Sequence, residues 1–441
     1  MMASSPQAPV WVRPDRPIMT RANLFLAAAI LGFPVVAAFV AVAAPRLPLL
    51  QHRSMPVLAA NHLVTLGWAT TVALGALQQL LPAAAGVRRD PSAVVTLQFV
   101  LHMLGVILLT TGFWTRKTSL LIAGGTAIAV GIFTFAALAA SILRQRTRWL
   151  PGLRFVTAAI VCLVSVATWG LVLVLNWRLV FWRTVLLPTG LEVHLGLGLL
   201  GWFGLLITGV SYYLLPRFSG IRDLSALRPG VVFAGLTAAV TGIVLGAFLS
   251  PLLVRAGLVA AGMAGLVYAA DLRRFVRAWR SDAWDITRAH WRIIVVETLL
   301  LSVGAGLGGL GLLPSDTTRW LIAGVSLFLL GWVTLAITGQ AYKVTPFLMW
   351  YYRYRVGLTP FEVPRLEAPY WPRAGVAPFA LLASAGPLIA LGVLVRSPVI
   401  SAVGGAAFLA GACLFSFVLG YSWLPRLWTI GRRPPSPAEP R

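Results

Sequence analysis

One motif occurs three times in this chain, each time near the end of a long apolar segment. The motif is Gly-Trp, six residues, Gly, six residues and Pro, and its copies begin at Gly67, Gly201 and Gly331. Successive copies begin roughly 130 residues apart, and a repeat of that length indicates three similar units that pack against one another. The motif therefore predicts an internally repeated fold.

The composition places this fold in a membrane. Of the 441 residues, 59% are hydrophobic and 11% are charged, which is too little polar surface for a water-soluble protein of this size. Twelve apolar segments are each long enough to cross a bilayer as a helix. These segments are residues 22–44, 56–82, 91–113, 118–141, 152–175, 185–215, 229–249, 251–270, 292–313, 320–346, 374–395 and 399–424.

Twelve helices and three motif copies predict four helices per repeat. We expect an all-α integral membrane protein with twelve transmembrane helices in three pseudo-symmetric four-helix arcs, and the motif on helices 2, 6 and 10. The single membrane domain covers residues 22–428, with repeats at about 22–141, 152–270 and 292–424. Residues 1–21 are expected to form a cytoplasmic tail, and residues 429–441 a disordered C-terminal tail.

The net charge of +24 has an uneven distribution along the chain. About three quarters of the 36 lysines and arginines fall in the tails and in alternate loops, which places those segments on the cytoplasmic side. The charge is therefore explained by membrane orientation and contact with lipid, and a nucleic-acid partner is not expected. We expect a multi-pass protein of the bacterial inner membrane with both termini in the cytoplasm.

Three of the five histidines lie inside predicted helices. His62 precedes the first Gly-Trp by five residues and His194 precedes the second by seven, so both lie at a similar depth. His102 lies near the middle of the third helix. Imidazole is the usual axial ligand of haem b and a common copper ligand, so all three are candidate cofactor ligands. The matched pair, His62 and His194, is the candidate metal site.

Two side chains are placed to orient these rings. Glu192 lies two residues before His194, and Gln98 lies one helical turn before His102. An alternative interpretation is structural: the histidines bond to the backbone or to one another, Glu192 faces water and Gln98 pairs elsewhere. Ionisable residues inside membranes are rare and mark functional sites by default, but neutral histidine is the least costly of them to bury, so both interpretations stay open.

The pattern of repeats and histidines is similar to a known family. The segments NHLVTLGW (Asn61–Trp68) and HLGLGLLGWFGLLITGVSYYLLPRF (His194–Phe218) resemble the histidine-containing helices of subunit I of the haem–copper oxidase superfamily. The nearest branch contains nitric-oxide reductase large subunits and C-type cytochrome oxidases. The resemblance implies a low-spin haem ligand at His62, a copper ligand at His194, and a cytochrome or another respiratory-chain subunit as a partner.

The chain also departs from that family. The family has further histidines on helices 7 and 10 and a tyrosine one turn after the helix 6 histidine, where this chain has Gly198. The complete dioxygen- or NO-reducing centre is therefore not expected, and the sequence leaves enzymatic activity open. We expect a divergent relative that binds haem b or copper in electron transfer or NO/oxygen physiology. The alternative is a transporter or accessory subunit without a cofactor.

Other polar residues lie outside this pattern. His52 and His290 are expected in solvated loops, and the loops at 271–291 and 347–373 are candidates for docking a partner or lipid headgroups. Glu297 is expected to pair with Arg292. The polar pairs that begin at Gln78, Tyr212 and Tyr342 occupy equivalent motif positions; they either line a water-filled path or anchor the helices at the membrane surface.

The charge distribution generates a prediction about topology. A periplasm-dependent reporter fused after Arg441 should be inactive, and a cytoplasm-dependent reporter fused there should be active, because the basic segments stay inside. The matched control is a fusion in the short loop after Arg116, which should show the reverse. A C-terminal fusion that is active only in the periplasm would contradict this topology.

Overall fold

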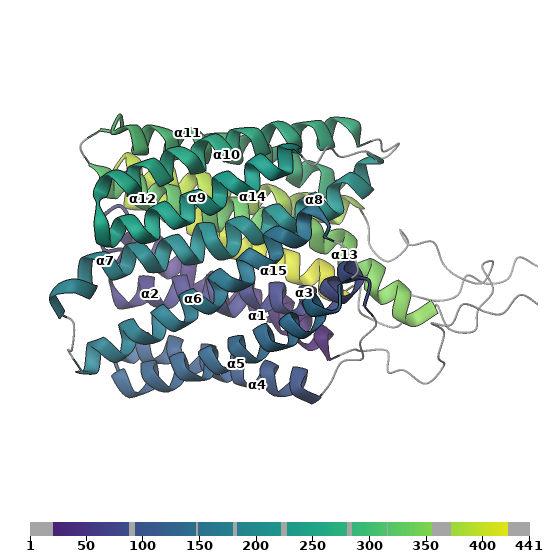
Figure 1. The fold of residues 1–441 in the computed structure, drawn as a ribbon, viewed down its shortest axis with the longest axis horizontal. Coiled ribbons are helices and arrows are strands. Elements are labelled where there is room, and N and C mark those ends of the chain that lie inside the picture. The colour runs from purple at the N-terminus through teal and green to yellow at the C-terminus, as the bar shows by residue number, and fades with distance from the viewer. Residues whose placement is uncertain are drawn as a thin grey trace, which may run out of the picture.

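The chain is helical throughout its described part. The computed structural model describes residues 21–87, 93–146, 149–179, 183–221, 227–279, 285–314, 316–354 and 372–421. In these residues, twelve helical spans are long and apolar enough to cross a membrane (Figure 1). This confirms the prediction of an all-α membrane protein with twelve spans. Of the predicted tails, only Arg21 lies within the described residues.

The spans are of two kinds. Nine spans are continuous α-helices: α1 (Ala22–Ala43), α4 (Ala93–Thr115), α5 (Thr118–Arg144), α6 (Pro151–Leu179), α9 (Leu227–Leu249), α10 (Pro251–Ala278), α11 (Ile286–Leu310), α14 (Val376–Leu394) and α15 (Pro398–Tyr421). Three spans are interrupted by a π-helical segment: α2 (Met55–His62), η2 (Leu63–Thr70) and α3 (Thr71–Ala85); α7 (Arg183–Leu195), η3 (Gly196–Gly204) and α8 (Leu205–Ser219); α12 (Thr317–Ser326), η4 (Leu327–Val333) and α13 (Thr334–Tyr354). Two short 3₁₀ turns are η1 (Ala44–Arg46) and η5 (Pro372–Gly375).

The interrupted spans are the three that carry the motif. Each Gly-Trp pair lies inside the π-helical segment of its span. A π-helical turn is wider than an α-helical turn, and such turns inside α-helices are frequent at functional sites. The motif therefore marks the same local distortion in each repeat, a property that the sequence pattern alone does not indicate.

The second glycine of each motif makes the same contact in all three repeats. A methyl group added to this glycine would lie 2.6–2.8 Å from the Cβ atom of one residue on the first helix of that repeat. The pairs are Gly75 with Phe25, Gly209 with Phe155, and Gly339 with His290. Such contact between helices requires a residue without a side chain. Recurring contacts are what an internal repeat predicts; a single rotation relating all three repeats stays a prediction.

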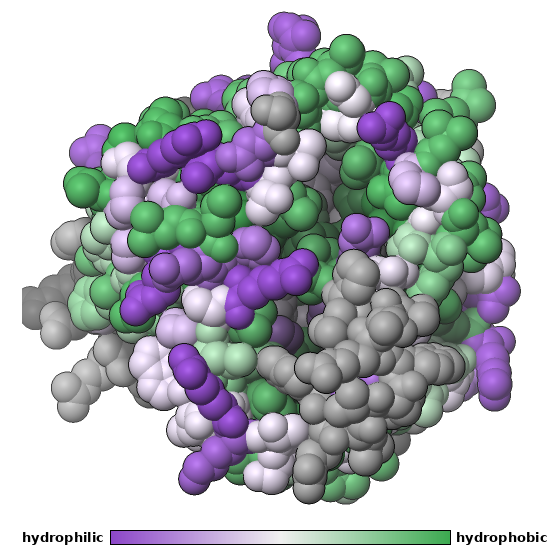
Figure 2. All heavy atoms as spheres, turned by 90° about the vertical axis from the view of Figure 1, so that its left-hand side faces the viewer, coloured by the Kyte–Doolittle hydropathy of each residue, from purple (hydrophilic) through white to green (hydrophobic). Residues whose placement is uncertain are grey.

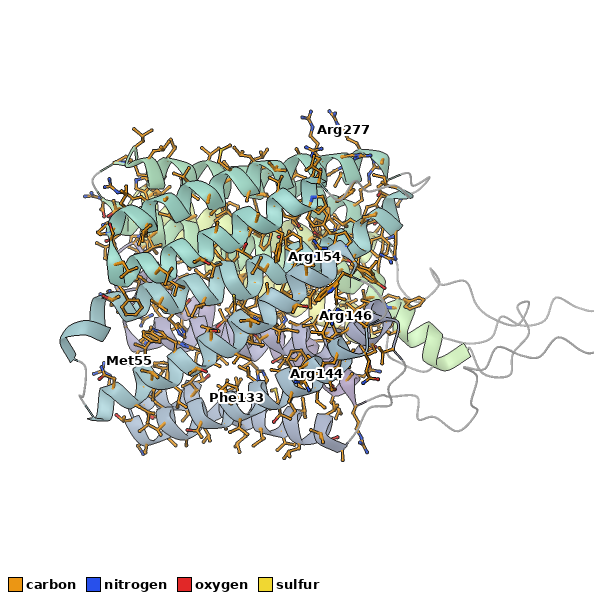
Figure 3. All side chains as sticks on the ribbon, viewed as in Figure 1. Met55, Phe133, Arg144, Arg146, Arg154 and Arg277 are labelled. Atoms are coloured by element: carbon orange, nitrogen blue, oxygen red, sulfur yellow. The ribbon has the colours of Figure 1, made fainter. Side chains whose placement is uncertain are left out.

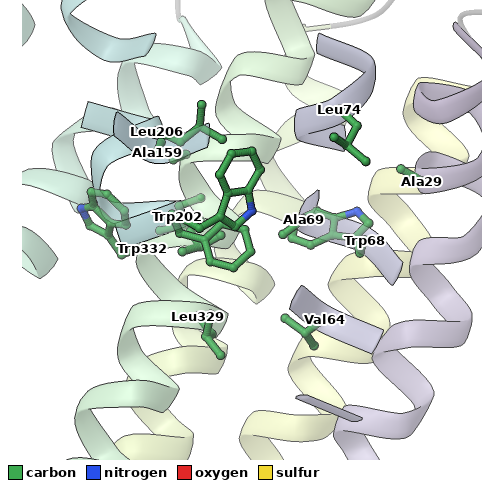
Figure 4. Close-up of a cluster of buried hydrophobic side chains, with 14 of the residues drawn as sticks. Ala29, Val64, Trp68, Ala69, Leu74, Ala159, Trp202, Leu206, Leu329 and Trp332 are labelled. Carbon is green, nitrogen blue, oxygen red and sulfur yellow. The ribbon is translucent and has the colours of Figure 1, made fainter. Parts of the chain in front are cut away.

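The motif tryptophans are buried at the centre of the molecule (Figure 4). Trp68 stacks on Phe33 with ring centroids 4.1 Å apart. The indole N–H of Trp202 donates to Thr70 Oγ1 at 3.0 Å, which joins η3 to η2. The indole N–H of Trp332 donates to Thr298 Oγ1 at 2.9 Å. These contacts hold the interrupted spans against their neighbours.

The helix ends differ from the prediction at the arginine-rich end of the bundle, which we call the basic face. The predicted loop at 271–291 is largely helical, because α10 continues to Ala278 and α11 begins at Ile286. The predicted loop at 347–373 is likewise helical as far as Tyr354, and residues 355–371 lie outside the described part. Arginines extend a helix beyond the apolar core because their long side chains reach the headgroups.

The basic face lies at one end of the bundle. Figure 3 places Arg144, Arg146, Arg154 and Arg277 toward the same end, with Met55 toward the other. The break between α9 and α10 at Ser250 is also as predicted: Ser250 Oγ accepts a hydrogen bond from the amide of Leu252, and Pro251 starts α10.

Helix packing predicts opposite effects for two adjacent glycines. A methyl group at Gly124 would lie 2.4 Å from the backbone nitrogen of Leu109, so Gly124→Ala should destabilise the protein by about 1–3 kcal/mol through forced separation of α4 and α5. At Gly125 the nearest atom would be 3.7 Å away, so Gly125→Ala should be neutral, or stabilising by up to about 1 kcal/mol through helix propensity. Thermal unfolding in detergent measures both. Equal stabilities for the two variants would contradict this packing.

Candidate functional site

A cavity of about 270 Å³ lies inside the bundle on the side away from the basic face. Its wall is mostly apolar and comes from the first and second repeats together with α12, η4 and α14. It extends from His52 and Arg53, in the loop before α2, inward to Trp202 and Leu330. Figure 2 views this end of the molecule and shows a hollow among hydrophobic and hydrophilic side chains. Its polar lining residues are His52, Arg53, Asn61, His62, Thr65, Thr70, His194 and Ser326.

The two predicted ligands, His62 and His194, both line this cavity. His62 is the last residue of α2, and His194 is the penultimate residue of α7, so each lies directly before a π-helical segment. Their ring centroids are 6.3 Å apart, with an angle of 34° between the ring planes. The structure thus brings together the pair that was selected by depth alone.

The hydrogen bonding of His62 leaves one ring nitrogen available. Its Nδ1 lies 2.8 Å from the carbonyl oxygen of Leu58, so Nδ1 carries the hydrogen and donates. The Nε2 lone pair then has no partner among the described residues. The ring also stacks on Phe113, with centroids 4.7 Å apart. A backbone bond at one nitrogen and an open lone pair at the other is the usual arrangement of a histidine ligand.

His194 occupies space left by a glycine. A methyl group at Gly170 of α6 would lie 3.1 Å from Cε1 of this imidazole. The Nδ1 atom of His194 is buried and has no hydrogen-bond partner among the described residues. A buried ring nitrogen without a partner is uncommon in folded proteins and calls for an explanation, such as a bound group or water. Sequence reasoning did not identify Gly170, because its role depends on contact with another helix.

His102 does not belong to this site. It is buried, and its Nε2 lies 3.1 Å from both Thr71 Oγ1 and the carbonyl oxygen of Leu66. Leu66 lies in η2, so His102 provides a partner to the backbone beside the π-helical distortion. Of the two interpretations offered for His102, this contact supports the structural one.

Neither of the two predicted orienting residues is placed against its histidine. Gln98 is buried and accepts a hydrogen bond from Gln78 at 2.8 Å, so it pairs with another glutamine instead of His102. The side chain of Glu192 is exposed. Residues two apart point in different directions around a helix, which is why Glu192 does not face the cavity with His194.

Two predictions in the third repeat are wrong. His290 is fully buried within α11, with Nδ1 2.7 Å from the carbonyl oxygen of Ile286, and does not lie in a solvated loop. Glu297 is also buried and does not pair with Arg292, which is exposed. A separation of five residues places them about 140° apart around the helix. Neither carboxylate oxygen of Glu297 has a hydrogen-bond partner among the described residues.

The polar motif residues near the basic face are tied into pairs. Gln78 bonds Gln98, and the hydroxyl of Tyr212 donates to Asp271 at 2.8 Å. Lys343 forms an ion pair with Asp285 at 2.9 Å. Each pair joins two helices, which agrees better with anchoring than with an open path.

The mouth of the cavity was missed by sequence reasoning. His52 was expected to be solvated, but it is half-buried and lines the cavity beside Arg53. Burial lowers the pKa of His52, its hydrogen bond to the Leu50 carbonyl raises it, and the charge of Arg53 lowers it. With a lowered pKa the imidazole is neutral at pH 7, so Arg53 supplies the positive charge at the mouth.

A metal held by protein ligands alone would need more than this pair. Within the described residues, no group of three or more histidine, cysteine or acidic side chains could hold a metal ion. The two imidazoles therefore suit a group that brings its own remaining ligands, such as a haem, or a metal ion bound by two ligands. No family model matches the chain, and no curated protein matches it.

Proposed function

We propose that the chain holds one haem b between His62 and His194 and serves in electron transfer or NO/oxygen physiology in a bacterial inner membrane. The observation that carries this proposal is the imidazole separation. Two imidazoles that bind one metal ion from opposite sides, each at about 2 Å, have ring centres roughly 6 Å apart. The ring centroids of His62 and His194 are 6.3 Å apart, a separation compatible with that arrangement.

The residues that line the cavity suit a haem chemically, but the cavity is small for one. Its apolar wall suits a porphyrin, and Arg53 at the mouth suits the two propionates, since guanidinium pairs well with carboxylate. The volume of about 270 Å³ lies slightly below the usual range for small-molecule sites. Seating the macrocycle therefore requires its lining side chains to repack. A haem held there would supply one-electron transfer, and the chain would provide the two imidazoles, the apolar wall and the cationic mouth.

The proposed orientation of the chain determines which side of the membrane the cavity faces. If the arginine-rich end faces the cytoplasm, the cavity lies toward the periplasm. An electron donor such as a cytochrome or another respiratory-chain subunit would then approach the mouth near Arg53. The resemblance of the motif helices to subunit I of haem–copper oxidases supports the same physiology.

A second candidate is a transporter or accessory subunit without a cofactor. One observation favours it: neither α9 nor the described residues of the α12–α13 span contain the further histidines of the family's copper centre. Copper alone is less well supported than haem, because no third protein ligand lies near the two histidines in the described part of the chain. A colourless, metal-free purified protein would favour this candidate.

Visible absorption of the purified protein tests the proposal. The wild-type chain should show the Soret and visible bands of a haem with two imidazole ligands. His62→Ala and His194→Ala should each abolish or shift these bands, because one axial ligand is lost.

Two control variants separate ligation from general damage. His102→Ala removes a buried histidine outside the cavity, and Trp68→Phe changes the motif without touching the pair; both should retain the bands. Bands that survive loss of His62 and His194 but disappear with His102 would contradict the proposed ligand pair.

A further inference from the structure

The most unusual polar group outside the cavity is the carboxyl of Glu297. It lies eleven residues into α11, about 16 Å from the start of the helix and close to the middle of the span. The residue is 2% exposed, and neither carboxylate oxygen has a hydrogen-bond partner among the described residues. An ionised carboxylate at this depth without a partner is strongly unfavourable.

The repeat explains how the carboxyl is accommodated. Glu297 lies seven residues after His290, and the equivalent positions after Phe25 and Phe155 are Gly32 and Cys162. In the second repeat, Cys162 packs against the motif glycine Gly201. In the third, Glu297 packs against Gly331 in η4, where an added methyl group would lie 2.4 Å from Oε1. The third repeat thus has an acid at a position occupied by small residues in the other two.

Within the part of the chain that the structure describes, no neighbouring charge compensates the acid. On α10, Asp271 is held by Arg228 and Tyr212, and Tyr268 contacts Ser211. On α13, Lys343 pairs with Asp285; on α12, Arg319 pairs with Asp316. On α11 itself, Arg292 is exposed, Arg288 bonds the Val276 carbonyl oxygen and His290 lies two turns away. Neither η4 nor α14 contains a titratable side chain.

We propose that Glu297 is a proton-binding site within the membrane, protonated at neutral pH and in exchange with the basic face along α11 and α13. The site is independent of the histidine cavity. The acid is neutral in its resting state and releases a proton only when a base or water reaches it.

The exchange route follows from unpaired polar atoms between Glu297 and the basic face. His290 lies on the same side of α11 as Glu297, since seven residues make almost two full turns. Its Nε2 is buried and has no hydrogen-bond partner among the described residues. The same is true of both side-chain amide atoms of Gln340 on α13, next to Gly339, which His290 contacts. Buried polar atoms of this kind are satisfied by ordered water in folded proteins. This series of polar groups ends at the Lys343–Asp285 ion pair.

Infrared difference spectroscopy of the full-length protein in detergent tests the protonation state. At neutral pH the wild type should show a carboxylic-acid C=O band that shifts in D₂O. The isosteric Glu297→Gln should lose the band, and Glu192→Gln, which changes an exposed acid, should keep it. Carboxylate bands from Glu297 at neutral pH would overturn the proposal.

A second measurement does not depend on a variant that folds. A hydrophobic carbodiimide adds to protonated carboxyl groups in apolar surroundings, so peptide mass spectrometry of the wild type should find the adduct at Glu297 and not at Asp285. Absence of the adduct, or its suppression by sodium ions and not by potassium ions, would overturn the assignment of a proton as the ligand.

The route has its own matched variant. Repeats one and two have Phe25 and Phe155 where the third repeat has His290, so His290→Phe restores the residue used elsewhere in the fold. This substitution should keep the Glu297 band and slow its shift after transfer to D₂O by at least several-fold. An unchanged exchange rate would overturn the route.

Discussion

Close backbone contact at the motif glycines is the constraint on which the rest of this structure depends. Helices in a bilayer gain little from apolar burial against one another, so they associate through tight packing and hydrogen bonds. Gly75, Gly209 and Gly339 each admit the Cβ atom of a neighbouring helix to a distance that no side chain would allow. These contacts fix the three interrupted spans at the centre, and both sites described above lie against these spans.

Much of the architecture follows from the sequence. Twelve apolar segments and a repeated motif predict the spans because length and hydropathy determine which segments a bilayer accepts. Helix ends at the basic face are less predictable, because α10 and α13 extend past the apolar segments into arginine-containing residues. For the same reason the sequence predicts His290 in a loop, whereas it lies inside α11 and is buried in the bundle.

The candidate site was only partly predictable. Equal depth selected His62 and His194, and the structure places both beside one cavity. The π-helical segments, the space at Gly170 and the mouth at Arg53 depend on contacts between distant residues, which one sequence does not reveal. A contact can also be predicted wrongly. Glu297 and Arg292 are close in the chain, which suggested an ion pair, but the helix directs their side chains to different surroundings.

We propose that His62 and His194, which come from different repeats, bind one haem between them in the cavity. Low-temperature electron paramagnetic resonance of the oxidised, purified protein tests it most directly, because the spin state of ferric haem depends on the number of strong axial ligands. The account predicts one low-spin haem per chain that becomes high-spin when either His62 or His194 is replaced by alanine. A protein without iron, or a haem signal that neither substitution changes, would contradict it.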